Sequence, residues 1–487
     1  MTIYQPKEDS MHHLLSFPGV DSNIRLLEAW IESLVAYKNL PGLSIGIVCD
    51  QDLIWARGFG FSDPEAQVPA SPKTLYRIAS ITKLFTSTAI MQLRDAGKLN
   101  LDDPVSKHLS WYNIRDRFPD SPKTTIRHLL THTSGLPREA AFPYWIDFRF
   151  PSREQIRQTL PDQETAYPRE TMWKYSNLGL SLAGEIVQEV SGEPYPDYIK
   201  KHILEPLEMN STRVVLSEKE RNKVAKGFGR KMPDGSRLAM PFTDSKGITP
   251  AANMSSNVED LAKFISLQFR TESKEQSRVL KASTLREMHR IHWIQPDWTW
   301  GWGLGFGVKH MDGKVIVSHG GALAGYKTRV SFCPEIKVGV VVGINSNDGD
   351  PLVFCDQVFR MVAPHIAIAA KKEKSQAGKS NPSWKKYIGK YRNLWWDAQI
   401  MIYGDNLVLI DPQVNEPQKD MVRLEHEKEH VFRLKGNDGS MSIGEKLIFE
   451  LDANENITRV KVGESYMFPI DSWYDPMPGT DLLEPVD

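Results

Sequence analysis

The chain has 487 residues, a length that favours two or three domains and a large buried core. Its 40% hydrophobic and 25% charged residues are ordinary for a soluble globular protein. The 60 Lys and Arg residues almost balance the 61 Asp and Glu residues, which leaves a net charge of −1. This balance excludes a strongly acidic or basic disordered chain. It also gives no sign of the excess positive charge that binds nucleic acid or an anionic membrane.

The cysteines and the N-terminus predict the compartment. Cys49, Cys333 and Cys355 are too few for a disulfide framework and lie in or beside apolar stretches, so buried thiols in a reducing compartment are expected. The N-terminus lacks the basic and apolar regions of a secretory signal. No uninterrupted run of about 18 apolar residues would span a bilayer. We therefore expect a cytoplasmic protein with no membrane and no nucleic-acid partner, and we leave self-association open.

The N-terminal half begins with a helix and two strands. Apolar residues at helical spacing predict a helix over 22–37, with an N-cap at Asp21 or Ser22. Strands over 43–50 and 53–63 follow, joined by a turn at 50–52. The pattern then changes to a helix over 80–97. Residues 98–300 are mostly helix and loop, with candidate helices at 124–132, 176–192 and 257–269.

Strand patterns return after this helical insert. Residues 315–319, 327–334 and 337–346 predict three consecutive antiparallel strands, and 351–370 predicts a helix. Strands need partners and sheet faces need cover, so one sheet built from both ends of the region is the economical interpretation. The fold class is α/β (α+β): an antiparallel sheet flanked by helices, with a large helical insert.

The C-terminal part predicts a second domain. Residues 371–383 are polar and charged and contain Gly and Pro, as is typical of a linker. After them, 384–487 contains short strand-like runs with turn signals, which favours a small antiparallel barrel or sandwich. The expected organisation is a first domain over 1–370, with its helical insert at about 98–300, then a linker and a second, β-rich domain over 384–487.

Residues 80–83 (SITK) form an S-x-x-K tetrad where the pattern changes from strand to helix. Positions i and i+3 share a helix face, so the ammonium of Lys83 can approach the hydroxyl of Ser80. The first helical turn favours negative charge on the serine oxygen, and the apolar neighbours would lower the lysine pKa, as a base requires. Alone, the tetrad equally fits a capped helix with a surface lysine, and 383–386 matches it too.

A second motif, Y-x-N, lies at Tyr175-Ser176-Asn177 in a loop before a predicted helix. The phenol can relay a proton, and the amide can orient a substrate carbonyl and the lysine. A buried aromatic residue and a helix cap explain the same residues structurally.

A third motif, His319-Gly320-Gly321-Ala322, ends a predicted strand. Glycines let a strand edge approach a ligand closely, and the following N–H can then point at an oxyanion. A bulge or a hairpin turn is the structural alternative for H-G-G by itself.

Taken together and in this order, the motifs resemble the penicillin-recognising serine hydrolases. Tyr175 in place of the serine of S-D-N is similar to the branch of class C β-lactamases, D-alanyl peptidases, esterases and acyltransferases. The resemblance covers roughly residues 20–370. Further segments that look like family signatures are 97–105 (GKLNLDDPV), 126–137 (IRHLLTHTSGLP), 175–187 (YSNLGLSLAGEIV) and 251–264 (AANMSSNVEDLAKF). The C-terminal region resembles the lipocalin-like barrel appended to some members, on the weak signal of 387–392 (YIGKYR).

The resemblance implies a role for each motif. Ser80 would be the nucleophile, activated by Lys83 and Tyr175, with the identity of the first base left open. Asn177 would contact substrate, together with the H-G-G strand. The backbone N–H groups of Ser80 and Ala322 would form the oxyanion hole.

Position 319 departs from the β-lactamase pattern, because His stands where the lysine of K-T-G is usual, and Gly320 replaces the hydroxyl residue. Histidine is mostly neutral at pH 7, so a permanent cation for a β-lactam carboxylate is missing there. We therefore expect a hydrolase of esters or amides of small molecules or peptides, with weak or no β-lactamase activity. An acyltransferase in small-molecule metabolism, using the same acyl-enzyme, and a catalytically silent binding protein are the alternatives.

The remaining candidates favour structural roles. The pairs His289/His292 and His426/His430 have metal-compatible spacing but lack a third ligand, so no metal and no cofactor are expected. The dense tryptophans at 293–302 read as core, with an aromatic cleft wall for an apolar group as the minority interpretation.

Overall fold

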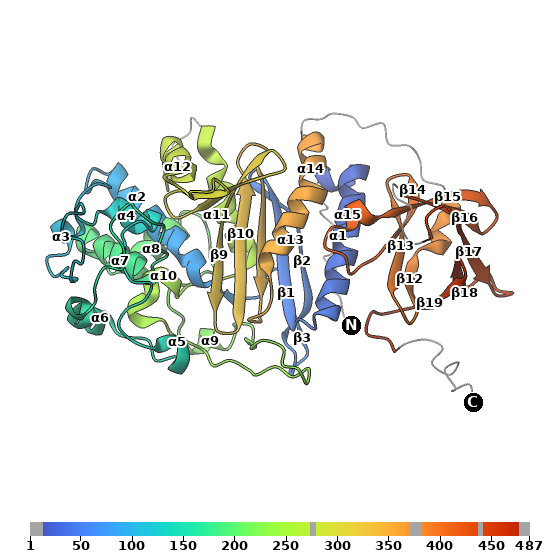
Figure 1. Ribbon diagram of the computed structural model, residues 1–487, viewed down its shortest axis with the longest axis horizontal. Helices are drawn as coiled ribbons and strands as arrows, with labels where there is room; N and C mark the ends of the chain where they lie inside the picture. Colours follow the sequence, from blue (N-terminus) through green and yellow to red (C-terminus); the bar gives the residue numbers. More distant parts are fainter. Residues whose placement is uncertain (1–12, 273–278, 371–381, 437–441, 477–487) are drawn as a thin grey trace. The chain divides into compact units, whose positions relative to one another are not determined.

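A computed structural model describes residues 13–272, 279–370, 382–436 and 442–476 (Figure 1). The chain divides into two compact units. One contains Leu40–Cys355, and the other combines the segment up to Asn39 with the chain from Asp356 onward.

The first unit is built on one nine-stranded antiparallel sheet with the strand order β3-β2-β1-β11-β10-β9-β8-β7-β6. The central strands are β1 (Gly42–Cys49) and β11 (Val338–Ile344), which pair from Leu43↔Ile344 to Cys49↔Val338. Both strands are buried along their whole length, which explains their nearly continuous apolar sequence. The prediction of one sheet made from both ends of the region is therefore confirmed. The other strands are β2 (Asp52–Asp63), β3 (Val68–Pro69), β6 (Trp293–Ile294), β7 (Trp300–Trp302), β8 (Gly307–Met311), β9 (Lys314–Leu323) and β10 (Tyr326–Cys333).

Helices cover this sheet, and α11 (Val258–Gln268) packs against its centre. A Cβ on Gly46 of β1 would lie 2.4 Å from Val258, and one on Gly339 of β11 would lie 2.4 Å from Ile265. The two glycines thus let the helix approach the sheet closely. Further helices gather on the side of β9 away from β1 (Figure 1). They include α2 (Thr82–Asp95), α4 (Ile126–Thr131), α5 (Tyr144–Asp147), α7 (Asn177–Ser191), α8 (Tyr195–Ile199), α10 (Thr249–Ala252) and α12 (Ala282–His289).

Two local predictions need correction. The H-G-G motif does not end its strand, because β9 continues to Leu323 and pairs with β10 in register, with Val330 opposite His319 and Thr328 opposite Gly321. The hydrogen bonds between β9 and β10 compensate for the low intrinsic preference of glycine for strands. The predicted helix over 351–370 contains a π-helical turn, Val358–Val362, between α13 (Pro351–Gln357) and α14 (Ala363–Ala370).

The second unit contains a closed eight-stranded antiparallel barrel. Its strands are β12 (Gly389–Arg392), β13 (Asp397–Tyr403), β14 (Asn406–Ile410), β15 (Val422–Lys428), β16 (Val431–Lys435), β17 (Lys446–Leu451), β18 (Ile457–Val462) and β19 (Ser465–Ile470). The barrel prediction is confirmed. The interior is a hydrophobic core that includes Tyr391, Phe432 and Phe449.

The N-terminal helix α1 (Pro18–Tyr37) belongs to the same unit as the barrel. Its indole at Trp30 is fully buried and donates a hydrogen bond to the carbonyl of Val414 at 2.8 Å. The helix starts at Pro18 and not at 22, because Phe17 takes the N-cap position and proline suits the first turn.

All three cysteines are buried thiols without disulfides, as predicted. The predicted linker lies outside the described residues from 371 to 381. One described helical stretch, Pro351–Ala370, has the length and apolar composition of a membrane span, but 56% of its most apolar window is buried within the protein, and core helices share these properties.

Candidate active site

Ser80 lies in a short 3-10 turn, Ala79–Ile81, that leads into α2. The residue before it, Ala79, is fully buried and has a φ of +47°. An L-residue in this left-handed region costs about 1–2 kcal/mol, so the surrounding core must hold the turn in place. Ser80 itself is only half-buried and lines a cavity of about 850 Å³. The hydroxyl is therefore held rigidly and remains accessible.

Lys83 lies one turn further along and is almost completely buried. Its Nζ donates hydrogen bonds to Ser80 Oγ at 2.9 Å, Asn177 Oδ1 at 2.7 Å and the carbonyl of Ala251 at 2.8 Å. Burial lowers the pKa of Lys83 well below its usual value, and nearby Arg138 lowers it further, whereas Glu139 raises it. The predicted approach of Lys83 to Ser80 is therefore present.

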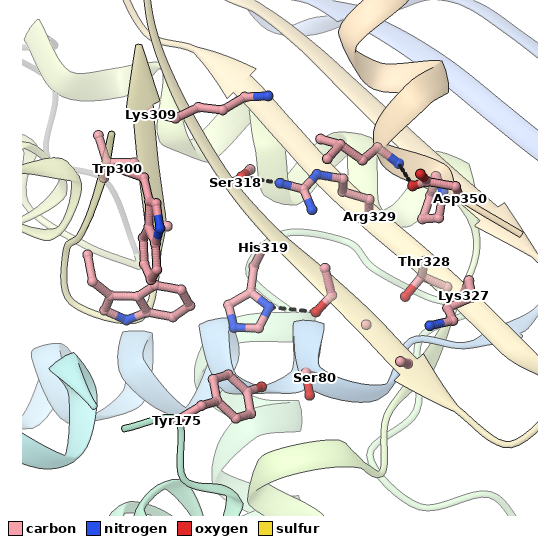
Figure 2. Close-up of a pocket in the computed structure, with 18 of the residues that line it drawn as sticks. Ser80, Tyr175, Trp300, Lys309, Ser318, His319, Lys327, Thr328, Arg329 and Asp350 are labelled. Carbon is pink, nitrogen blue, oxygen red and sulfur yellow. Dashed lines mark hydrogen bonds between the residues drawn. The ribbon is translucent and has the colours of Figure 1, made fainter. Parts of the chain in front are cut away.

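Tyr175 faces Ser80 from the segment before α7, and Figure 2 shows the phenol and the serine hydroxyl pointing toward one another below His319. The following residue, Ser176, caps α7 by accepting from Gly179 N at 2.9 Å, which fixes this segment. Burial raises the pKa of Tyr175, and a side-chain hydrogen bond with Ser80 offsets part of this rise. Lys83 Nζ lies 4.9 Å from the centre of the tyrosine ring. Serine, lysine and phenol thus converge, as the motifs predict.

Asn177 is held by a residue that sequence reasoning missed. Its Nδ2 donates to Glu139 Oε1 at 2.8 Å, which directs its Oδ1 to Lys83. The other carboxylate oxygen of Glu139 accepts a hydrogen bond from the buried Tyr144. The carboxylate also pairs with Arg138 at 3.1 Å. Only its place just after the 126–137 segment hinted at this role for Glu139.

The strand β9 forms another wall of the cavity, with His319 and the two glycines lining it. A Cβ on Gly321 would lie 2.2 Å from the carbonyl oxygen of Ile78 and 2.4 Å from Thr328 Oγ1. Glycine at 321 is therefore what allows β9 to lie against the turn that carries Ser80. Ala322 follows on the same strand and also lines the cavity.

His319 is buried and neutral. Its Nδ1 lies 2.7 Å from the carbonyl oxygen of Gly320, so Nδ1 carries the proton and Nε2 holds a lone pair. Nε2 has no hydrogen-bond partner among the residues that the structure describes. Burial lowers the pKa of His319 to about 3, with a further contribution from the charge of Lys83. The side chain therefore offers an acceptor where a lysine would offer a cation.

Positive charge reaches the cavity from the neighbouring strand, a feature that sequence reasoning missed. Lys327 and Arg329 of β10 line the cavity near His319 (Figure 2). Arg329 donates to the hydroxyls of Ser318 at 2.7 Å and Ser331 at 3.2 Å, and both partners are uncharged. A substrate in the cavity would experience these cations although position 319 is neutral.

The remaining sequence candidates lie elsewhere or have their own partners. His289 contacts Gln268 at 3.0 Å, whereas His292 contacts the carbonyl of Glu287. His430 contacts the hydroxyl of Tyr387. Two of the tryptophans at 293–302, Trp300 and Trp302, line the cavity. For these two, the alternative prediction of an aromatic cleft wall describes the structure.

Sequence comparison finds relatives over most of the chain. The beta-lactamase family model matches residues 27–357. Protein flp of Staphylococcus aureus strain MW2 is 28% identical over 328 residues, covering 66% of this chain and 63% of that protein. Beta-lactamase-like protein 2 of Dictyostelium discoideum is 29% identical over 325 residues, covering 65% and 58%. The chain thus spans less than two thirds of the length of these relatives.

Solved structures share the fold. The octameric penicillin-binding protein homologue from Pyrococcus abyssi has a TM-score of 0.63 and 26% identity, covering 91% of this chain and 99% of that one. A D-stereospecific amidohydrolase from Streptomyces sp. has a TM-score of 0.57 and 23% identity, covering 71% of this chain and 98% of its own. EstCE1, described as a hydrolase with promiscuous acyltransferase activity, has a TM-score of 0.58 and 19% identity, covering 71% and 99%.

Proposed function

Because the chain belongs to the beta-lactamase family, we propose that it is a serine hydrolase that cleaves an ester or amide of a small molecule or peptide through an acyl-enzyme on Ser80. The observation that carries the proposal is the 2.9 Å contact between Lys83 Nζ and Ser80 Oγ at the edge of a cavity, with the Tyr175 phenol opposite.

The pKa shifts favour Lys83 as the first base. A lysine whose pKa is lowered by burial is neutral often enough to accept the proton of Ser80 Oγ. The raised pKa of Tyr175 keeps its phenol protonated. In the proposed first step, Oγ attacks the carbonyl carbon while its proton moves to Lys83. The backbone N–H groups of Ser80 and Ala322 then stabilise the oxyanion.

The second half of the cycle releases the acyl group. As the bond to the leaving oxygen or nitrogen breaks, Tyr175 donates its proton to that atom and recovers one from Lys83. Water then attacks the acyl-enzyme, Lys83 accepts a water proton, and the acid departs as Ser80 Oγ is reprotonated. Asn177 supports both halves by holding Lys83 and by offering its amide to the substrate.

The neutral His319 supports weak or absent β-lactamase activity. The lone pair on Nε2 repels a carboxylate at the position where a lysine would bind it. The cationic side chains that line the cavity are Lys327 and Arg329 of β10, together with Lys309 of β8 and Arg138. Turnover of a chromogenic cephalosporin at a rate comparable with that of a simple activated ester would contradict this part of the proposal.

An acyltransferase is the second candidate, because a cavity of about 850 Å³ is large enough for an acyl donor and an acceptor together. The same acyl-enzyme serves both reactions. Product analysis with an added alcohol or amine separates them, since a transferase forms the new ester or amide faster than the free acid.

The decisive experiment is intact mass spectrometry after exposure to a fluorophosphonate and to a panel of activated esters, with Ser80→Ala as the matched control. We expect one covalent adduct on the wild type and none on the variant. Equal turnover by Ser80→Ala and the wild type would overturn the assignment.

A further inference from the structure

One side of the cavity beside Ser80 is a continuous group of aromatic rings, which we call the aromatic wall: Trp173, Tyr175, Trp300 and Trp302. All four line the cavity. Trp173 meets Trp300 perpendicularly at 4.8 Å between ring centres, and it meets Trp302 at 5.1 Å. Tyr175 joins the group through Trp173 at 5.8 Å. Ring separations of this size are those of mutually stabilising aromatic pairs.

The wall is preorganised. The indole of Trp302 is 7% exposed and donates a hydrogen bond to the carbonyl of Leu130 at 3.2 Å. Trp173 and Trp300 are half-buried and packed edge-to-face on one another, so only part of each ring remains for a ligand. A flat group lying on these rings would therefore meet an already fixed surface, at little entropic cost.

The aromatic wall lies on one side of the cavity. Trp300 lies on the other side of His319 from Lys327 and Asp350 (Figure 2). Two cations border the wall itself: Lys309 pairs with Trp300 between β7 and β8, and the Arg138 guanidinium lies 5.0 Å from the centre of the Tyr175 ring. Since Tyr175 is both a member of the wall and the residue that faces the Ser80 hydroxyl, the wall adjoins the position from which a leaving atom can be protonated.

We propose that the aromatic wall binds the leaving-group half of the substrate, and that this half is a flat apolar ring system carried by an alcohol or amine. The inference rests on the proposed acyl-enzyme at Ser80 and adds the substrate class. The ring packs against Trp173 and Trp300, face to face with one indole and edge to face with the other, and the scissile carbonyl lies over Ser80.

Two matched ester series test this orientation. In the first, the acyl group is acetyl and the alcohol is 2-naphthylmethanol or hexanol. In the second, the alcohol is ethanol and the acid is 2-naphthylacetic or octanoic acid. We expect kcat/KM to favour the naphthyl ester about tenfold in the first series, which is the scale of a good aromatic contact. A preference confined to the second series would overturn the assignment to the leaving group.

Substitutions then locate the preference. Trp300→Leu keeps an apolar side chain and removes the flat ring, so the naphthyl preference should fall to near unity. Trp298→Ala is the matched control, because Trp298 is 79% exposed and does not line the cavity. An unchanged preference in Trp300→Leu, with the circular dichroism of the wild type, would overturn the proposal.

A binding measurement keeps the test independent of turnover. Titration of the folded Ser80→Ala protein with 2-naphthylmethanol and with hexanol, followed by calorimetry, should show at least tenfold tighter binding of the aromatic alcohol. The combination Ser80→Ala/Trp300→Leu should lose this difference. Equal affinities would reject the wall as a ring site while leaving the role of Ser80 untouched, whereas an active Ser80→Ala would reject the proposed function by itself.

Discussion

The Nδ2 atom of Asn177 lies 2.8 Å from Oε1 of Glu139, and this contact decides which end of the amide faces Lys83. With the carboxylate as acceptor, the NH2 group must point toward Glu139, which leaves the carbonyl oxygen for Lys83. An amide turned the other way would present a donor to the amine.

The first prediction concerns this contact. Glu139→Ala removes the acceptor and should lower kcat/KM about 100-fold, because a misplaced Asn177 no longer fixes Lys83. Glu139→Gln retains an acceptor and should keep most of the activity. Steady-state kinetics on an activated ester measures both. Equal losses in the two variants, with unchanged thermal stability, would contradict a role in orienting Asn177.

The second prediction concerns pH. Lys83 accepts a proton only when neutral, so kcat/KM should rise as the pH increases through the lysine pKa and be lost below it. Arg138 lowers this pKa and Glu139 raises it. Arg138→Gln should therefore move the acidic limb of the profile to higher pH, whereas Glu139→Gln should move it to lower pH.

If the acidic limb moved in the same direction in Arg138→Gln and in Glu139→Gln, it would not report the titration of Lys83. Lys174→Gln, which replaces a half-buried lysine next to Tyr175 in sequence, serves as a control for general loss of positive charge.

The third prediction compares two adjacent glycines. A Cβ on Gly321 would lie 2.2 Å from the carbonyl oxygen of Ile78, whereas a Cβ on Gly320 would first meet the end of the Arg329 side chain at 3.2 Å. Gly321→Ala should lower the free energy of unfolding by about 1–3 kcal/mol and largely abolish turnover, since backbone must move. Gly320→Ala should be nearly neutral. Thermal unfolding and ester hydrolysis report both, and similar behaviour of the two variants would contradict the close approach of β9.

The fourth prediction concerns position 319. His319→Lys places a cation where the neutral imidazole now offers a lone pair, so KM for carboxylate-bearing acyl donors should fall about tenfold relative to uncharged ones. His319→Asn, which stays uncharged, is the control. An unchanged preference in His319→Lys would mean that this residue lies outside the reach of the substrate.

The fifth prediction concerns the second unit. Trp30 is fully buried and hydrogen-bonded to the carbonyl of Val414. Trp30→Ala should cost about 3–5 kcal/mol of unfolding free energy, and Trp30→Phe, which loses the N–H and part of the ring volume, should cost less than Trp30→Ala. Denaturant unfolding followed by circular dichroism measures the difference. Equal midpoints for wild type and Trp30→Ala would show that α1 contributes nothing to this unit.

Local patterns predicted that Ser80, Lys83 and Tyr175 lie together, because each motif carries its own helix or strand signal. Ser80 and Lys83 are one turn apart, and their contact follows from helical spacing alone. Glu139 escaped notice because its role depends on Asn177, which is distant in sequence. Lys327 and Arg329 were missed for a similar reason, since only the pairing of β10 with β9 brings them to the cavity.

In the fold too, elements with a local sequence pattern were predicted, whereas placements that depend on distant contacts were not. The period-two and apolar runs located β1, β2, β10 and β11 to within one or two residues. The placement of α1 in the unit of the barrel had no local signal, because its contact with Val414 joins residues that are 384 positions apart. The predicted strand ended too early, at 319, because glycine has a low intrinsic preference for strands. Hydrogen bonding to β10 holds Gly320 and Gly321 in β9 nevertheless.

The pairing of β1 with β11 has a consequence for biosynthesis. The ribosome releases β1 early and β11 only after the whole helical insert, so the nascent polypeptide carries an open, apolar strand edge during most of translation. Such edges invite association with other chains, and the nonlocal closure is intrinsically slow. A truncated product that stops before residue 338 would keep Ser80 and lose the central strand β11, so we expect it to aggregate rather than to accumulate as a partly folded protein.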